Sequence, residues 1–190
     1  MLVVCSAGLH GAGKSVLSEV AAQMGFTVVS MGDAVRREAL RRGLEPTDSV
    51  LSSLSVQLRR EEGATAVAKL TLKMIDPSAK MLLIDGLRSY DEFVFFKQKF
   101  ENCVLVSIHA SPKTRYQRWK GRGRLDDPKS YEGFLQRDLL ELGFGLGTLM
   151  ALADYHLVNQ CVTLEEFKSE CKKLLEHIIQ KFVEASELDK

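Results

Sequence analysis

The sequence has little of several residue types on which common protein classes depend. Among its 190 residues there are four prolines and one tryptophan, and no stretch stays apolar over the ~18 residues that a membrane-spanning helix needs. An excess of one charge is also absent, because 26 lysines and arginines balance 25 aspartates and glutamates. Such a chain is not expected to bind nucleic acid or a membrane, so any anion chemistry must come from local basic clusters. Residues 2–4 lead into glycine-rich sequence without the basic and long apolar regions of a signal peptide, which predicts a cytoplasmic protein.

Cysteine is scarce and scattered. Cys5, Cys103, Cys161 and Cys171 form no Cys-x-x-Cys pair, and no histidines stand beside them at the spacing of zinc ligands. The spacing therefore argues against a zinc site. We expect each cysteine to be a small buried thiol.

Short apolar runs alternate with segments of helix length along the chain. The runs span residues 2–7, 27–29, 81–84, 104–108 and 155–158. Continuous apolar runs of this length are typical of buried parallel strands, and their alternation with helices predicts an α/β fold with helices on both faces of a parallel sheet. The length and the average composition, 45% hydrophobic and 27% charged, favour a single domain over residues 1–190.

Local signals mark where several of the helices begin. Ser89 with Glu92, and Thr163 with Glu166, have the spacing of capping boxes, and Ser111 before a proline fits an N-cap followed by a first-turn proline. Two intervals are longer than a simple crossover requires, residues 31–76 and 113–154. We therefore expect each interval to house an insert.

The strongest motif lies between the first apolar run and the following helix. Residues 8–15 read Gly-Leu-His-Gly-Ala-Gly-Lys-Ser and match G-x-x-x-x-G-K-[ST] at every fixed position. Its glycines allow consecutive N–H groups and the positive helix end to face a phosphate. Lys14 is expected to neutralise the β- and γ-phosphates of ATP or GTP, and Ser15 to offer its hydroxyl to Mg²⁺. The residues predicted to bind the nucleotide are Gly8, His10, Gly11, Ala12, Gly13, Lys14, Ser15 and Val16.

His10 occupies a position that the motif leaves unconstrained. It either packs within the loop or contacts the substrate.

A second group of polar residues follows the third apolar run, at the sheet edge where open α/β proteins bind ligands. Asp85 there is a candidate partner for Mg²⁺ or its waters, or else caps the next turn. Arg88 is a candidate grip for a substrate phosphate, or else forms a surface salt bridge. Gly86 lies between them and is included in the predicted acceptor site.

A third group follows the second apolar run. Gly32 leads into a helix, and Asp33 either caps that helix or meets the substrate. Arg36 begins a cluster of arginines, about half of which we expect to lie on a solvated face. Gly32, Asp33 and Arg36 complete the predicted acceptor site.

Arginines are dense in the second long interval, and Arg122, Arg124 and Arg137 are the candidates for catalysis there, beside Lys14 and Arg88. Charge builds on the transferring phosphoryl in its transition state, and arginines on a closing flap neutralise it while excluding water. Each of these arginines has an ordinary surface role as its alternative.

Taken in order, these segments resemble the nucleoside-monophosphate kinases, particularly adenylate kinase, and dephospho-coenzyme A kinase more loosely. The resemblance rests on residues 30–36 and 84–89. Together with residues 108–115, 126–128 and 153–155, these segments are also similar, over almost the whole chain, to an archaeal P-loop family described as adenylate-kinase-related. The proline that precedes the strand-three arginine in adenylate kinase is missing, and so are the zinc-type cysteines of its lid.

The resemblance implies a P-loop three-layer fold with strand order 2-3-1-4-5. It also implies a core of residues 1–30, 77–120 and 138–190, an acceptor-binding insert at about 31–76 and a short lid at about 121–137. Arg36 and Arg88 would hold the acceptor phosphate, while Arg122, Arg124 and Arg137 would approach the transferring phosphoryl. The loop at 159–162 would border the donor base.

Three functions are compatible with these features. The leading hypothesis is Mg²⁺-dependent transfer of the γ-phosphoryl of ATP to AMP or a related nucleotide, a small-molecule acceptor. The second is transfer to a hydroxyl, as in dephospho-coenzyme A kinase, with Asp33 as the base. The third is a slow NTPase whose bound nucleotide controls a partner. The sequence identifies neither the acceptor nor the oligomeric state.

Overall fold

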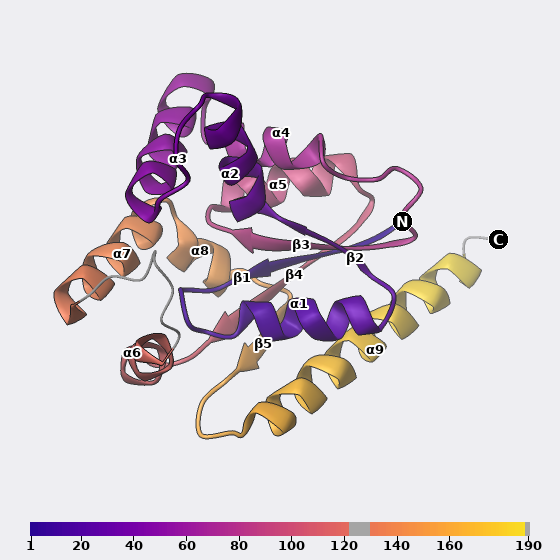
Figure 1. Ribbon diagram of the computed structural model, residues 1–190. Coiled ribbons are helices and arrows are strands. Elements are labelled where there is room, and N and C mark those ends of the chain that lie inside the picture. The colour runs from indigo at the N-terminus through magenta and orange to yellow at the C-terminus, as the bar shows by residue number, and fades with distance from the viewer. Residues whose placement is uncertain (122–129, 189–190) are drawn as a thin grey trace.

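A five-stranded parallel sheet forms the centre of the protein, which is described here from a computed structural model covering residues 1–121 and 130–188 (Figure 1). The strands are β1 (Leu2–Ala7), β2 (Thr27–Ser30), β3 (Met81–Leu87), β4 (Asn102–His109) and β5 (Tyr155–Val158). Their order is β2-β3-β1-β4-β5 and every neighbouring pair is parallel, which confirms the predicted sheet. The carboxyl ends of all five strands therefore meet at one edge.

Alternate residues of the central strand supply the cores on the two faces of the sheet. Leu2 and Val4 pack under α1 (Lys14–Gln23) and α9 (Leu164–Leu188). Val3 and Cys5 face the core to which α2 (Met31–Arg41), α3 (Asp48–Glu62), α4 (Ala66–Leu72), α5 (Tyr90–Lys99) and α8 (Leu146–Ala151) contribute. Helices thus cover both faces, as predicted (Figure 1).

The remaining two helices, α6 (Pro112–Lys120) and α7 (Tyr131–Gly143), lie at the carboxyl edge of the sheet (Figure 1). The capping box of Ser89 and Glu92 and the N-cap of Ser111 are present as predicted. The long interval 31–76 contains α2, α3 and α4. Within the described residues, no helix combines the length and the hydropathy that a membrane span requires.

Two local predictions were wrong. Strand β3 was expected over residues 81–84 but runs three residues further, so it includes Asp85 and Gly86. Cys161 is exposed rather than buried, because it lies in the bend after β5 and outside both hydrophobic cores. The other three cysteines are buried free thiols, as expected.

Candidate active site

The loop between β1 and α1 has the backbone that phosphate binding requires. Gly11 and Gly13 have φ values of 77° and 117°, in the region that side chains disfavour. A side chain at Gly13 would also collide with the Asn159 amide. That amide donates to Ala12 O at 2.9 Å, so the loop after β5 helps to hold the first loop in place. Consecutive N–H groups at the start of α1 are thereby available to an anion.

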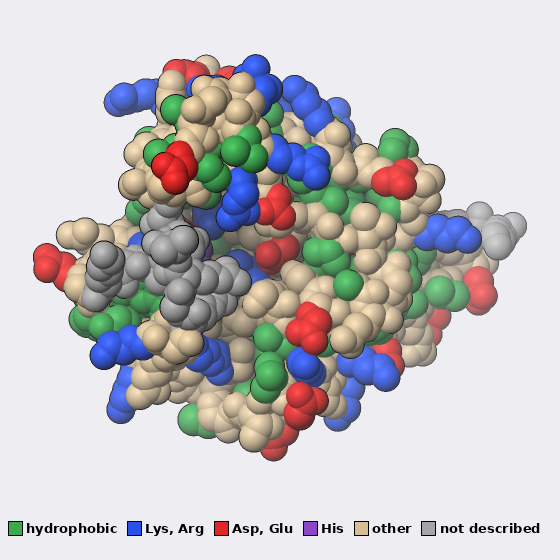
Figure 2. All heavy atoms as spheres, in the orientation of Figure 1, with side chains coloured by type: hydrophobic (Ala, Val, Ile, Leu, Met, Phe, Trp, Pro, Cys, Tyr) green, Lys and Arg blue, Asp and Glu red, His purple; other side chains and the backbone are tan. Residues whose placement is uncertain are grey.

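The loop opens into a cavity of about 320 Å³ at the carboxyl edge of the sheet. Figure 2 shows basic and acidic side chains gathered around a hollow on this face of the molecule. The cavity brings together most of the predicted site residues, namely His10, Gly11, Gly13, Lys14, Ser15, Gly32, Asp33, Arg36, Asp85, Gly86, Arg88 and Arg137. Segments up to 127 residues apart in the chain therefore converge on one site.

Five predicted site residues either do not line the cavity or lie outside the described residues. Ala12 is buried, and Val16 packs against the core under α1 and α9. Gly8 does not line the cavity, although its carbonyl oxygen accepts a hydrogen bond of 2.6 Å from Lys14 Nζ. Arg122 and Arg124 lie outside the described residues.

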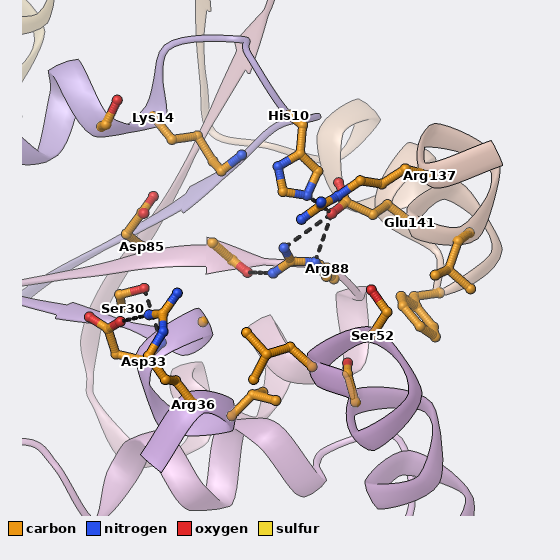
Figure 3. A pocket seen from close by; sticks show the side chains of 18 of the residues that line it. His10, Lys14, Ser30, Asp33, Arg36, Ser52, Asp85, Arg88, Arg137 and Glu141 are labelled. Carbon is orange, nitrogen blue, oxygen red and sulfur yellow. Dashed lines mark hydrogen bonds and ion pairs between the residues drawn. The ribbon is translucent and has the colours of Figure 1, made fainter. Parts of the chain in front are cut away.

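Lys14 projects from the start of α1 along the loop. Besides the bond to Gly8, its ammonium donates to Leu9 O at 3.3 Å. Figure 3 shows Lys14 and His10 on one side of the cavity, with Asp33 and Arg36 on the opposite side and Arg88 between them. The cavity thus has one side formed by the loop between β1 and α1 and a second side formed by α2.

Arg88 is held at both its backbone and its side chain. Its backbone N–H donates to Glu92 Oε2 at 2.8 Å, inside the capping box that begins α5. Its Nη1 donates to Gly86 O at 2.9 Å, while Nε and Nη2 both lie 3.1 Å from Glu141 Oε1. Glu141 in turn raises the pKa of Arg88. The guanidinium of Arg88 is therefore permanently charged and fixed in orientation.

His10 faces the same carboxylate from the loop side. Its Nε2 pairs with Glu141 Oε1. Burial lowers the pKa of His10 to about 4, although the nearby Glu141 carboxylate acts to raise it. Burial acts to raise the pKa of Glu141. The effects of Arg88 and then of His10 are in the opposite direction and together larger, so the pKa of Glu141 lies well below its ordinary range. With this pKa the imidazole is uncharged at neutral pH, and a proton on Nε2 rather than on Nδ1 is the tautomer that suits the neighbouring carboxylate oxygen.

Helix α7 is docked against the loop by a second buried ion pair. Arg115 of α6 donates from Nη1 and Nη2 to the two carboxylate oxygens of Asp138, at 2.8 and 2.5 Å. The same guanidinium donates to His10 O at 3.1 Å, so the loop, α6 and α7 share one side chain. Arg137, which lines the cavity, precedes Asp138 on α7, the helix that this contact joins to α6 and the loop.

On the α2 side, Ser30 is the N-cap of α2, with its hydroxyl accepting from Asp33 N at 3.4 Å. The capping role considered for Asp33 therefore belongs to Ser30. The Asp33 carboxylate instead pairs with Arg36 one turn later, and both side chains are about half exposed, 54% and 46%. Both remain accessible to a ligand in the cavity.

The oxygens around Ser15 and Asp85 fit the requirements of Mg²⁺. Asp85 Oδ1 accepts from Ser6 Oγ at 2.6 Å, which fixes the carboxylate at the cavity wall, and Ser15 lines the same cavity from the start of α1. Among the residues that the structure describes, no cluster of three or more His, Cys, Asp or Glu side chains is able to hold a metal alone. Mg²⁺ suits such a sparse site, since it takes one or two protein oxygens and completes its shell with phosphates and water.

Comparisons with known proteins agree with this architecture. The model of the AAA domain family matches residues 7–133. A UPF0200 protein of Hyperthermus butylicus is 51% identical over 93% of this chain and 95% of its own length. The chain belongs to the UPF0200 family. Other UPF0200 proteins, from Thermococcus kodakarensis and Methanocaldococcus jannaschii, are 43% and 40% identical and are covered over 100% and 91% of their lengths.

Solved structures share the fold of this UPF0200 chain at much lower identity. Shikimate kinase from Bacteroides thetaiotaomicron superposes with a TM-score of 0.61 at 15% identity, covering 92% of this chain and 98% of that one. A gluconokinase from Sinorhizobium meliloti gives 0.56 at 15% identity, with 97% of each chain covered. These likenesses confirm the predicted P-loop kinase fold.

Several residues of the cavity were not predicted from the sequence. They are Ser30, Val35, Leu51, Ser52, Ser55, Leu140, Glu141 and Phe144. Ser52 and Ser55 are three residues apart on α3, and Glu141 is four residues after Arg137 on α7. At these spacings two side chains lie on the same face of a helix, which is the sequence signal that links Glu141 to the predicted Arg137.

Proposed function

We propose that this protein transfers the γ-phosphoryl group of ATP to the phosphate of a nucleoside monophosphate, AMP or a related nucleotide. The observation that supports the proposal is the shared cavity, in which Lys14 and the phosphate-binding loop face Arg88 and Arg36. Two guanidinium groups on the acceptor side suit an acceptor that itself carries a phosphate. The match to the AAA domain family and the P-loop kinase fold support phosphoryl transfer to a nucleotide or another small molecule.

In the proposed reaction the protein contributes positioning and charge. The loop N–H groups and Lys14 hold the donor phosphates, while Arg88 and Arg36 orient the acceptor phosphate toward them. Arg137 approaches from α7 to neutralise charge on the transferring group. Because a phosphate oxygen is already a nucleophile, no general base is needed. Ser15 and Asp85 would hold Mg²⁺, which when bound neutralises the β- and γ-phosphate oxygens.

An acceptor panel tests the proposal directly. Purified protein with ATP and Mg²⁺ is expected to convert at least one common nucleoside monophosphate to its diphosphate. One ADP forms from each ATP consumed, and with AMP as the acceptor the diphosphate is a second ADP. Chromatographic separation of the nucleotides measures both products. If no monophosphate in the panel yields a diphosphate while ATP binds, the proposed function is wrong.

Transfer to a hydroxyl is the second candidate, because Asp33 presents a half-exposed carboxylate to the cavity. A base is required for a hydroxyl but not for a phosphate. We therefore expect Asp33→Asn to keep turnover with a monophosphate within about threefold of the native rate, well short of the ~100-fold that loss of a general base costs. Steady-state kinetics measure the effect. A loss approaching 100-fold, together with turnover of dephospho-coenzyme A, contradicts the monophosphate proposal and supports the hydroxyl.

A further inference from the structure

A buried carboxylate stands among the cations of the cavity, and the proposed reaction gives it no role. Glu141 lies on α7 with a side-chain exposure of 5%, and its Oε1 meets both Arg88 and His10. A negative charge here opposes the binding of phosphates, since like charges in a poorly hydrated site repel strongly. We therefore expect Glu141 to contribute to the reaction in a way that outweighs its repulsion of the phosphates.

The contacts to Glu141 and Gly86 do not use all five N–H groups of the Arg88 guanidinium, which lines the cavity. Glu141 takes the edge formed by Nε and Nη2, and Gly86 O takes one N–H of Nη1. A guanidinium has five N–H groups in a fixed plane, so two edges fixed in this way set the direction of the N–H groups that remain. Those groups are the ones available to an acceptor phosphate.

The same oxygen also fixes the donor side. By pairing with His10 Nε2, Glu141 connects the phosphate-binding loop to Arg88, and Figure 3 shows the carboxylate between the two side chains. Glu141 lies one turn after Arg137 on the same face of α7, so this contact also fixes the helix that carries Arg137. One carboxylate thus joins the three elements that must be aligned for transfer.

We propose that Glu141 is a positioning residue that sets the separation and orientation of the donor loop and Arg88. The inference rests on the proposed phosphoryl transfer to a phosphate acceptor. Glu141 then has two effects that can be measured separately. Its charge lowers the affinity for the anionic substrate, while its position raises the rate of transfer. A misplacement of about 1 Å in such a site can lower a rate by about 100-fold.

Two substitutions distinguish charge from placement. Glu141→Gln removes the charge at nearly constant size, so kcat is expected to fall about 10- to 100-fold while AMP binds about three- to tenfold more tightly. Glu141→Asp keeps the charge but withdraws the carboxylate by one methylene, so kcat falls by a similar factor while the affinity for AMP stays native. A residue with a purely structural role predicts loss of affinity and of thermal stability in both variants instead.

Glu132→Gln is the matched control, because Glu132 lies exposed in the first turn of the same helix and outside the cavity. This variant is expected to keep the native kcat and the native affinity for AMP. Calorimetry with AMP gives the affinity, steady-state kinetics give kcat, and thermal unfolding shows whether each variant is folded. Native kcat in a folded Glu141→Gln variant, or a parallel loss of affinity in both Glu141 variants, overturns the proposal.

A spectroscopic measurement keeps the test independent of turnover. In nitrogen-15 NMR spectra at neutral pH, His10 is expected as the tautomer with its proton on Nε2, and Glu141→Gln is expected to change the tautomer populations; His10→Gln assigns the signal. If the native protein turns over no monophosphate, the proposed function is wrong. The positioning role of Glu141 is then tested by the His10 tautomer and by the affinity for ATP in the Glu141→Gln variant. An unchanged tautomer with unchanged ATP affinity then overturns the inference.

Discussion

Lys14→Ala is expected to lower kcat by about 10²- to 10³-fold while the protein stays folded. The ammonium of Lys14 is held over the loop by Gly8 O and Leu9 O at 2.6 and 3.3 Å, at the wall of the cavity. In the proposed reaction it is the cation of the loop that meets the donor phosphates, so its removal leaves the charge that develops on them without a fixed partner. The core under α1 does not include this side chain. Turnover of ATP with a monophosphate measures the loss.

Lys113→Ala is the matched control for this prediction, since Lys113 is an exposed lysine on α6 that does not line the cavity. It is expected to keep native kcat. Circular dichroism and thermal unfolding show whether each variant is folded. Native turnover by a folded Lys14→Ala variant would contradict both the assignment of the donor site to the loop and the proposed function.

The fold was predictable because its signals are local and repeated. The central strands β1, β3 and β4 contain short apolar runs that are largely buried, and the order of runs and helices is sufficient for a parallel sheet. The extension of β3 was not predictable, because Asp85 interrupts the apolar run. The strand continues past it since Gly86 adopts a φ of 91° and Leu87 pairs with Ala7 after a shift in register. A polar residue inside a strand end gives no periodic signal of this kind.

The site was predictable where its residues are neighbours in sequence. The loop motif and the groups around Asp33 and Asp85 each follow a strand, and parallel strands bring their carboxyl ends together. Glu141 was missed because its partner Arg88 is 53 residues away, and a single glutamate on an amphipathic helix is usually solvated. Arg88 itself, considered as a surface salt bridge, forms its ion pair inside the cavity with 22% of its side chain exposed.

Arg88→Lys is expected to lower kcat/KM for the acceptor by about 100-fold with ATP affinity within about twofold of native. Lysine keeps the charge and so remains a partner for Glu141, but its ammonium cannot at once meet Glu141, Gly86 O and a phosphate in the plane that the guanidinium provides. Arg88→Ala is less informative, because it removes the cation from the buried Glu141 carboxylate and leaves it facing only the uncharged His10, at a cost of about 3–5 kcal/mol. Steady-state kinetics with varied acceptor, and calorimetry with ATP, measure the two quantities.

Arg60→Lys makes the same chemical change at an exposed position of α3 and is expected to be native in both quantities. The comparison decides which side of the cavity Arg88 serves. Loss confined to the acceptor supports the two-sided site, in which the loop binds one phosphate chain and Arg88 the other. An equal loss of ATP affinity contradicts it, because Arg88 would then belong to the donor site and Arg36 would be left as the acceptor-side cation of the cavity among the residues described. A single half-exposed arginine is a weak clamp for a phosphate, so that result would favour an acceptor without one.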